Sequence, residues 1–113
     1  MPESPTLTEF SAILKAGTPL LDVRSPGEFA RGAIPGAINL PILDDDQRHA
    51  VGIHYKKAGT TAAVNFGHQL ISGEIKESRL KSWIDFFDRN PTAKIYCFRG
   101  GLRSNITKEW LSK

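Results

Sequence analysis

Residues 20–41 read LLDVRSPGEFARGAIPGAINLP, and this stretch decides the fold. The apolar run over residues 19–24 has the length and composition of a buried strand. A Ser-x-x-Glu capping box begins at Ser25 with proline at the first helical position, and Gly32 is the expected end of that short helix. After a Pro-Gly turn, residues 37–40 predict a second, brief strand. The stretch therefore predicts a strand, a helix and another strand in immediate succession.

The remaining segments continue this alternation of helices and strands. Gly59 is expected to separate two helices, because glycine breaks an otherwise continuous helical pattern there. The other expected helices and the last strand follow from apolar spacing and capping residues: helices over residues 6–16, 44–58, 61–72, 76–89 and from Ser104 onward, and a strand over 93–98. We therefore expect an α/β fold with a small parallel sheet and helices on both faces.

Length and composition exclude several classes of protein. The chain of 113 residues fits a single domain, residues 1–113. No apolar run approaches the ~20 residues of a membrane-spanning helix, and the polar start is not a signal peptide, so we expect no membrane partner. The net charge of +3 is compatible with anionic partners without identifying one. The single cysteine, Cys97, excludes an internal disulfide and suits a reducing compartment, here taken as the cytoplasm.

That cysteine opens the loop CFRGGLRS, residues 97–104, at the end of the last expected strand. The two glycines let successive backbone amides turn inward and form a nest for an anion, and the following helix adds its positive end. The two arginines supply guanidinium groups that suit oxyanions, and all three features favour the thiolate over the thiol. The predicted site has Cys97 as its catalytic nucleophile, with Phe98, Arg99, Gly100, Gly101, Leu102, Arg103 and Ser104 binding the substrate.

Three functions are compatible with this loop. A cysteine, five residues, an arginine and a serine form the spacing of cysteine-dependent phosphatases and arsenate reductases, whereas sulfurtransferase loops of the rhodanese kind are usually one residue shorter. The acidic run 44–46 could supply the general acid of a phosphatase, although a solvated helix start is the simpler interpretation. A binding module without chemistry is the third possibility, and the intact cysteine and arginines argue against it.

Two regions carry a family resemblance. Residues 20–41 look like the N-terminal signature of rhodanese-like domains, and the Cys97 loop occupies the position of their second hallmark. The stretches HAVGIHYKKAG, residues 49–59, and FGHQLI, residues 66–71, resemble the middle of bacterial tRNA 2-selenouridine synthases, as does the Arg-Gly-Gly-x-Arg-Ser form of the loop. Together these similarities span nearly the whole chain.

The resemblance implies that the α/β fold is rhodanese-like, and it also implies a function. A member of this family replaces sulfur by selenium in 2-thiouridine at the tRNA wobble position, with selenophosphate as the small anionic chalcogen donor and no bound cofactor. Cys97 matches the family's essential cysteine and is expected to carry the chalcogen in a persulfide-type intermediate. Members of the family also contain a P-loop, and no G-x-x-x-x-G-K-[ST] pattern occurs here, while the sequence ends inside a helical pattern. We therefore expect this chain to be a fragment that lacks the P-loop region, and an isolated domain to lack the full tRNA-modifying activity.

Further polar residues have a supporting or a structural interpretation. Asp22 or Arg24 could brace the cysteine loop from a neighbouring strand, whereas the simpler expectation is an Arg24–Glu28 ion pair and a helix cap. The three histidines are spaced by five and fourteen residues, so they do not share a helix face and we expect no metal site. The bulky aromatic residues at helical spacing, Trp83, Phe86, Phe87 and Trp110, are expected to pack in the core.

Overall fold

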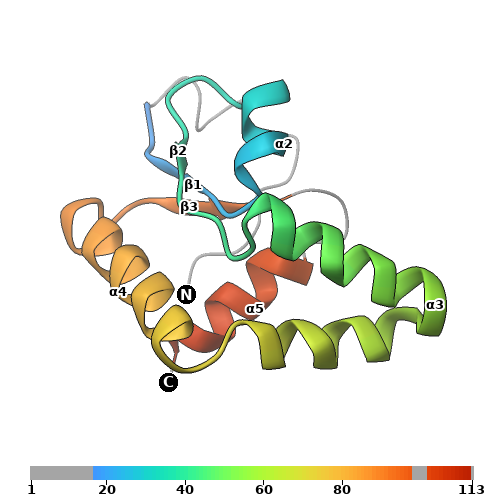
Figure 1. The fold of residues 1–113 in the computed structure, drawn as a ribbon. Coiled ribbons are helices and arrows are strands. Elements are labelled where there is room, and N and C mark those ends of the chain that lie inside the picture. Colours follow the sequence, from blue (N-terminus) through green and yellow to red (C-terminus); the bar gives the residue numbers. More distant parts are fainter. Residues whose placement is uncertain (1–16, 98–101, 113) are drawn as a thin grey trace.

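The computed structural model describes residues 17–97 and 102–112 (Figure 1). The elements alternate as predicted, in the order β1 (Leu20–Asp22), α2 (Pro26–Arg31), β2 (Ile38–Asn39), α3 (Asp45–Leu70), α4 (Gly73–Arg89), β3 (Lys94–Tyr96) and α5 (Leu102–Leu111). The helix expected to begin at Thr6 lies outside the described residues. Among those that are described, no helix is both long enough and apolar enough to cross a membrane.

The three strands form a parallel sheet in the order β2-β1-β3. Leu21 of the central strand pairs with Ile38 on one side and with Ile95 on the other. Strand β1 is buried along its whole length, which explains why Leu20 and Leu21 follow each other instead of alternating with polar residues. Its third residue, Asp22, is also buried, and its charge is paired with Arg24. In Figure 1, α2 lies beside β1 and β2 at the upper right, whereas α4 and α5 lie below the strands, so helices flank the sheet on both sides as expected.

The parallel order brings the carboxyl ends of all three strands to one edge. The Val23 amide just beyond β1 donates to the Tyr96 carbonyl of β3 at 3.0 Å, and the Leu40 amide beyond β2 donates to the Asp22 carbonyl at 3.1 Å. Cys97 is the next residue after β3, so it lies at this edge beside the end of β1. Ligands of open α/β sheets bind at such an edge, and the candidate nucleophile is placed there by strand order alone.

The expected break at Gly59 is present. Gly59 has φ +88° and ψ −173°, a left-handed conformation that interrupts the helical backbone within α3. The chain therefore folds α3 into two limbs, residues 45–58 and 60–70, which double back on each other in Figure 1; we call them the α3 hairpin. His54 stacks on Phe66 across the hairpin, with ring centroids 3.7 Å apart. The sequence indicated two helices, but not that a single glycine would join them without a loop.

Two helix starts differ from the prediction. Helix α4 begins at Gly73 rather than at residue 76, because buried Ile71 ends the hairpin and Gly73, at φ +55°, turns the chain directly into the next helix. Helix α5 begins at Leu102 rather than Ser104. Ser104 therefore lies within the first turn of α5 instead of preceding it.

The core lies between the sheet and the helices beneath it. Trp83 of α4 is fully buried, and its indole N–H donates to the Leu40 carbonyl at 2.9 Å. Trp110 of α5 packs beside it with ring centroids 6.0 Å apart. Phe86 is also buried and Phe87 is partly buried, so the prediction that these aromatic residues pack in the core is confirmed.

Candidate active site

Cys97 and Ser104 meet at the start of α5. The Cys97 thiol donates to Ser104 Oγ at 3.3 Å, and the Ser104 backbone N–H donates to Cys97 Sγ at 3.3 Å. Both side chains are buried, with Cys97 7% exposed. The first amides of a helix have no partner within the helix and form its positive end, so the Ser104 amide places partial positive charge beside the sulfur.

The other predicted loop residues are placed unequally. Leu102 is half-exposed at the first position of α5, and Arg103 follows it. Phe98, Arg99, Gly100 and Gly101 lie outside the described residues. Of the predicted binding set, the structure therefore brings Ser104 against the sulfur and places Arg103 one residue earlier on the same helical turn.

Arg103 is held by Glu28 of α2. Its Nη1 donates to Glu28 Oε1 at 2.6 Å and its Nη2 donates to Oε2 at 3.2 Å, a two-pronged ion pair between residues 75 positions apart. The Ser25 amide and hydroxyl donate to the same Oε1 at 3.1 and 3.0 Å, so the predicted capping box is present. One carboxylate oxygen therefore accepts hydrogen bonds both from the capping residue and from Arg103. Arg48 of the α3 hairpin adds a third contact at 3.2 Å.

The hydrogen bonds from Arg103 and Ser25 keep the Glu28 carboxyl group ionised. Burial acts to raise the pKa of its carboxyl group, but the hydrogen bonds from Arg103 and Ser25 and the charge of Arg103 lower the pKa from 4.5 to about 2. Glu28 is therefore an anion throughout the neutral range. It fixes Arg103 at the start of α5 and ties together α2, α3 and α5.

The expected Arg24–Glu28 ion pair is wrong. Arg24 pairs with Asp22, through Nη2 to Oδ2 at 2.8 Å and Nε to both carboxylate oxygens at 3.1 Å. Residues two apart on an extended chain project to the same side, whereas Glu28 is carried away by the turn into α2. Arg24 Nη2 also donates to the Gly32 carbonyl at 2.8 Å. Of the three supporting residues, Glu28 is thus the one whose side chain contacts Arg103 of the loop, and Asp22 and Arg24 form a buried pair of their own.

The acidic run has the structural role that was the simpler interpretation. Asp44 caps α3 by accepting the Gln47 amide at 2.8 Å. Asp45 Oδ1 accepts the Gly27 amide of α2 at 2.8 Å, a contact between segments 18 residues apart that nothing in the local sequence indicated. Among residues 17–97 and 102–112, no three acidic, histidine or cysteine side chains are grouped closely enough to hold a metal ion.

A groove of about 900 Å³ lies between the α3 hairpin and α5. Cys97 and Arg103 line it together with Ile106 and Trp110, which follow on the same face of α5. The opposite wall carries apolar residues of both limbs, including Val51 and Ala63. The volume falls within the range of small-molecule sites, and the candidate nucleophile Cys97 is part of its lining.

The pH dependence of stability reports the Glu28 contacts. A carboxyl group whose pKa is lowered in the folded state adds stability above its unfolded pKa, and this is lost as the pH falls towards the folded pKa. We expect Glu28→Gln to unfold more easily than the parent at pH 6, by on the order of 2 kcal/mol, and the difference to shrink between pH 5 and pH 2. Urea unfolding at each pH measures this. Glu74→Gln, at the exposed start of α4, controls for the loss of one carboxylate, and an undiminished difference at pH 2 would contradict the prediction.

Comparison with known proteins defines the class. The family model of the rhodanese-like domain matches residues 6–113, so the chain belongs to the rhodanese-like domain family, as its fold and cysteine loop predicted. It is 52% identical over 113 residues to a tRNA 2-selenouridine synthase of Sulfurovum sp. (strain NBC37-1), covering 100% of this chain and 31% of the relative. It is 58% identical over 95 residues to the tRNA 2-selenouridine synthase of Chromohalobacter salexigens, covering 84% of this chain and 26% of the relative. The chain thus spans less than a third of the length of these relatives.

A solved structure agrees with the fold. The N-terminal domain of a protein from Clostridium difficile 630, named for ATP/GTP binding, superposes with a TM-score of 0.70 at 29% identity, over 84% of this chain and 73% of that one. Both relatives are named for the synthesis of 2-selenouridine in tRNA, and neither is named as a phosphatase or an arsenate reductase.

Proposed function

We propose that this chain is the chalcogen-carrying domain of an enzyme resembling the tRNA 2-selenouridine synthases. Cys97 takes a sulfur or selenium atom from a small anionic donor. A selenium atom held there replaces the sulfur of 2-thiouridine at the tRNA wobble position, and the displaced sulfur remains on Cys97 as a persulfide. The observation that carries the proposal is the Ser104 backbone N–H, 3.3 Å from Cys97 Sγ in the first turn of α5. The names of the relatives support tRNA as the acceptor. The single cysteine and a tRNA acceptor both support a cytoplasmic location.

A sulfane donor such as thiosulfate can load Cys97 without a further oxidant or reductant. The thiolate attacks the outer sulfur, a new S–S bond forms on Cys97, and the S–S bond of the donor breaks. Sulfite leaves with the bonding electron pair. The persulfide then passes its outer sulfur to a nucleophilic acceptor, and Cys97 departs as the thiolate.

Arg103 supplies positive charge for an anionic donor. Glu28 holds its guanidinium in one orientation before any donor arrives, so the site does not have to reorganise at the moment of reaction. Because the Glu28 carboxylate also lies there, only part of the Arg103 charge acts on a donor, and the amides of the α5 N-terminus contribute the rest.

With selenophosphate as the donor, the electron balance of the loading step determines which phosphorus product must form. Its selenium is at the selenide level, so attack by Cys97 on selenium leaves a Cys97-bound selenium only if phosphorus departs with the electron pair, as phosphite. Release of phosphate instead would leave selenium unattached to Cys97. The phosphorus product therefore reports whether the cysteine carries selenium.

Intact-mass measurement tests the proposal. After incubation with thiosulfate, the protein should gain one sulfur atom, which a reducing agent removes and which Cys97→Ala does not acquire. After incubation with selenophosphate, it should gain one selenium atom while phosphorus NMR detects phosphite. Absence of both adducts, a phosphoryl adduct, or hydrolysis of an aryl phosphate that depends on Cys97 would overturn the proposal; phosphate without a selenium adduct would overturn its selenium part.

A further inference from the structure

The groove beside Cys97 combines two properties that the loading reaction does not use. Its volume of about 900 Å³ is far larger than a thiosulfate or selenophosphate ion requires. Its walls carry apolar side chains that the fold leaves only partly covered, among them Val51, Val64 and Ile106. A planar apolar group fits such walls, whereas a small oxyanion gains nothing from them.

The position of the groove relates it to the second half of the reaction. Cys97 is 7% exposed and lines the groove, so the groove is a route by which an acceptor can approach Sγ. Tyr55 of the first limb of the α3 hairpin, which is 57% exposed, supplies an aromatic ring to the lining, whereas Trp110 of α5 is 5% exposed and packs on Trp83. Aromatic side chains next to apolar ones are typical of sites that hold an unstacked nucleobase.

The charges around the groove favour a polyanion. Among residues 17–97 and 102–112, the lining includes Arg31, Arg48, Lys56 and Arg103 but only one carboxylate, Asp45, whose Oδ1 already accepts the Gly27 amide. Arg48 and Arg103 share Glu28. Arg31 and Lys56, in contrast, have no carboxylate within ion-pair distance in the part of the chain that the structure describes.

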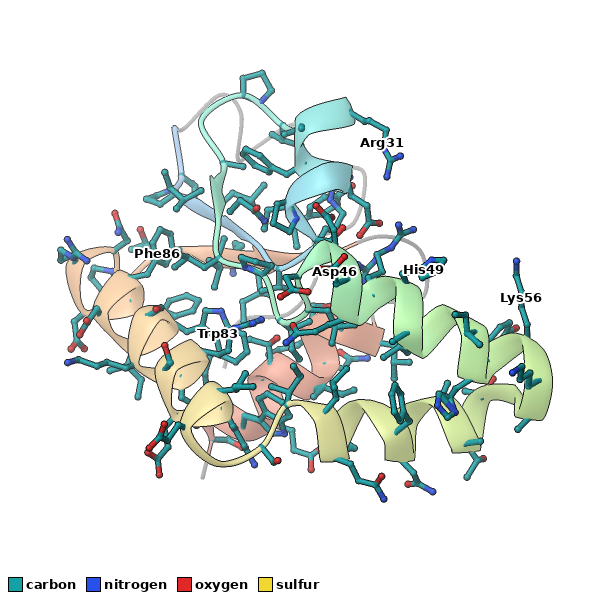
Figure 2. The ribbon with its side chains drawn as sticks, viewed as in Figure 1. Arg31, Asp46, His49, Lys56, Trp83 and Phe86 are labelled. Atoms are coloured by element: carbon teal, nitrogen blue, oxygen red, sulfur yellow. The ribbon has the colours of Figure 1, made fainter. Side chains whose placement is uncertain are left out.

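These cations are exposed where a bound strand would run. Figure 2 shows Arg31 at the end of α2 and His49 and Lys56 along the first limb of the α3 hairpin, all on one side of the molecule. A row of exposed basic side chains beside an apolar groove matches a strand whose phosphates remain outside while one base enters.

We propose that the groove between the α3 hairpin and α5 receives the acceptor base of an RNA strand, unstacked from its neighbours, while Arg31 and Lys56 bind the flanking phosphates. The apolar walls hold the base, and its edge is brought towards Sγ of Cys97. This inference rests on the proposed function, because that function requires a base to reach the cysteine. It adds the site at which the base binds.

Photochemical cross-linking tests where the base lies. The probe is an anticodon stem-loop RNA with 4-thiouridine at the wobble position, irradiated with the full chain. Peptides of the α3 hairpin and α5 should carry the cross-link, and the same RNA with 4-thiouridine in its stem should not label them. Cross-links confined to α4 or to the far side of the sheet, or no complex at all, would overturn the proposal. So would labelling of the groove by both RNAs alike.

The salt dependence of binding tests the two cations. Each phosphate contact to a single strand contributes about 0.7 to the slope of log affinity against log salt. The double variant Arg31→Ala/Lys56→Ala should therefore lower the slope by about 1.4. Lys57→Ala/Lys81→Ala removes the same charge from exposed positions outside the groove lining and serves as the matched control. Equal slopes for the two double variants would mean that Arg31 and Lys56 do not bind the phosphates of the strand, which would contradict the proposal.

The outcomes separate this inference from the proposed function. A chalcogen adduct on Cys97 without cross-links in the groove leaves the proposed function intact and overturns only the site of the base. Cross-links in the groove without a chalcogen adduct on Cys97 would leave the site of the base intact and overturn the proposed function. Occupation of the groove by a protein segment of a longer homologue, detected as loss of RNA cross-linking when that segment is present, would also overturn the assignment.

Discussion

Cys97→Ser is expected to reduce sulfur transfer from thiosulfate to cyanide by on the order of 1,000-fold or more, as removal of a catalytic nucleophile does elsewhere. Serine is nearly the same size as cysteine, and its hydroxyl can keep both contacts that Cys97 makes with Ser104. A hydroxyl is hardly ionised at neutral pH and forms no persulfide, so the variant removes the chemistry and leaves the packing.

Two measurements make this interpretation specific. The free energy of unfolding should change by less than about 1 kcal/mol, because the replacement conserves volume and hydrogen bonds. Cys97→Ala should be equally inactive although it lacks a hydroxyl. Transfer by Cys97→Ser within tenfold of the parent would show that another group accepts the sulfur and would contradict the assignment of Cys97 as nucleophile.

Asp22→Ala is expected to destabilise the protein by about 3–5 kcal/mol. Asp22 is 0% exposed, and its carboxylate accepts hydrogen bonds from the Arg24 guanidinium and from the Arg24 amide at 2.9 Å. Removal of the carboxylate leaves the Arg24 guanidinium, which is 8% exposed, with an uncompensated buried charge. The loss should therefore far exceed that of a surface ion pair, which is about 0–1 kcal/mol.

Paired variants distinguish a broken ion pair from a poorly tolerated strand substitution. Asp22→Ala combined with Arg24→Met should recover part of the stability, because replacement of both buried charges by apolar groups is far less costly than loss of one. Asp85→Ala, at an exposed position of α4, should change stability by no more than about 0.5 kcal/mol. Urea unfolding measures all three. A loss of less than about 1 kcal/mol of unfolding free energy in Asp22→Ala would contradict the buried-pair explanation. So would a double variant that is less stable than Asp22→Ala.

Much of the fold could be predicted from local patterns. The capping box at Ser25, the end of α2 at Gly32 and the break at Gly59 each depend on interactions within a few residues, so the sequence window contains their cause. Helix starts were predicted less well where tertiary packing determined them. The turn through Gly73 into α4, for example, follows from the burial of Ile71 in the core.

The candidate site was predictable in its chemistry but not in its contacts. Cys97 at the end of a strand, followed by glycines and arginines, is enough by its local pattern to indicate an anion-binding nucleophile. The partner of Arg103 could not be inferred, because Glu28 lies 75 residues away and was already explained by its local role as a capping residue. The expected Arg24–Glu28 pair was wrong for the same reason. It was inferred from proximity along the chain, whereas in the folded structure Arg24 pairs with Asp22.

The sequence by itself determined the succession of elements in this protein and identified Cys97 as the candidate nucleophile, since caps, breaks, apolar runs and the Cys-x5-Arg-Ser loop are all short-range patterns. Only the tertiary structure decided what surrounds that nucleophile. The parallel order β2-β1-β3 placed Cys97 at the edge of the sheet, Glu28 joined α2 to Arg103, and the hairpin through Gly59 formed a groove against α5. Each of these joins segments distant in sequence, and such contacts form only because the whole chain buries a common core.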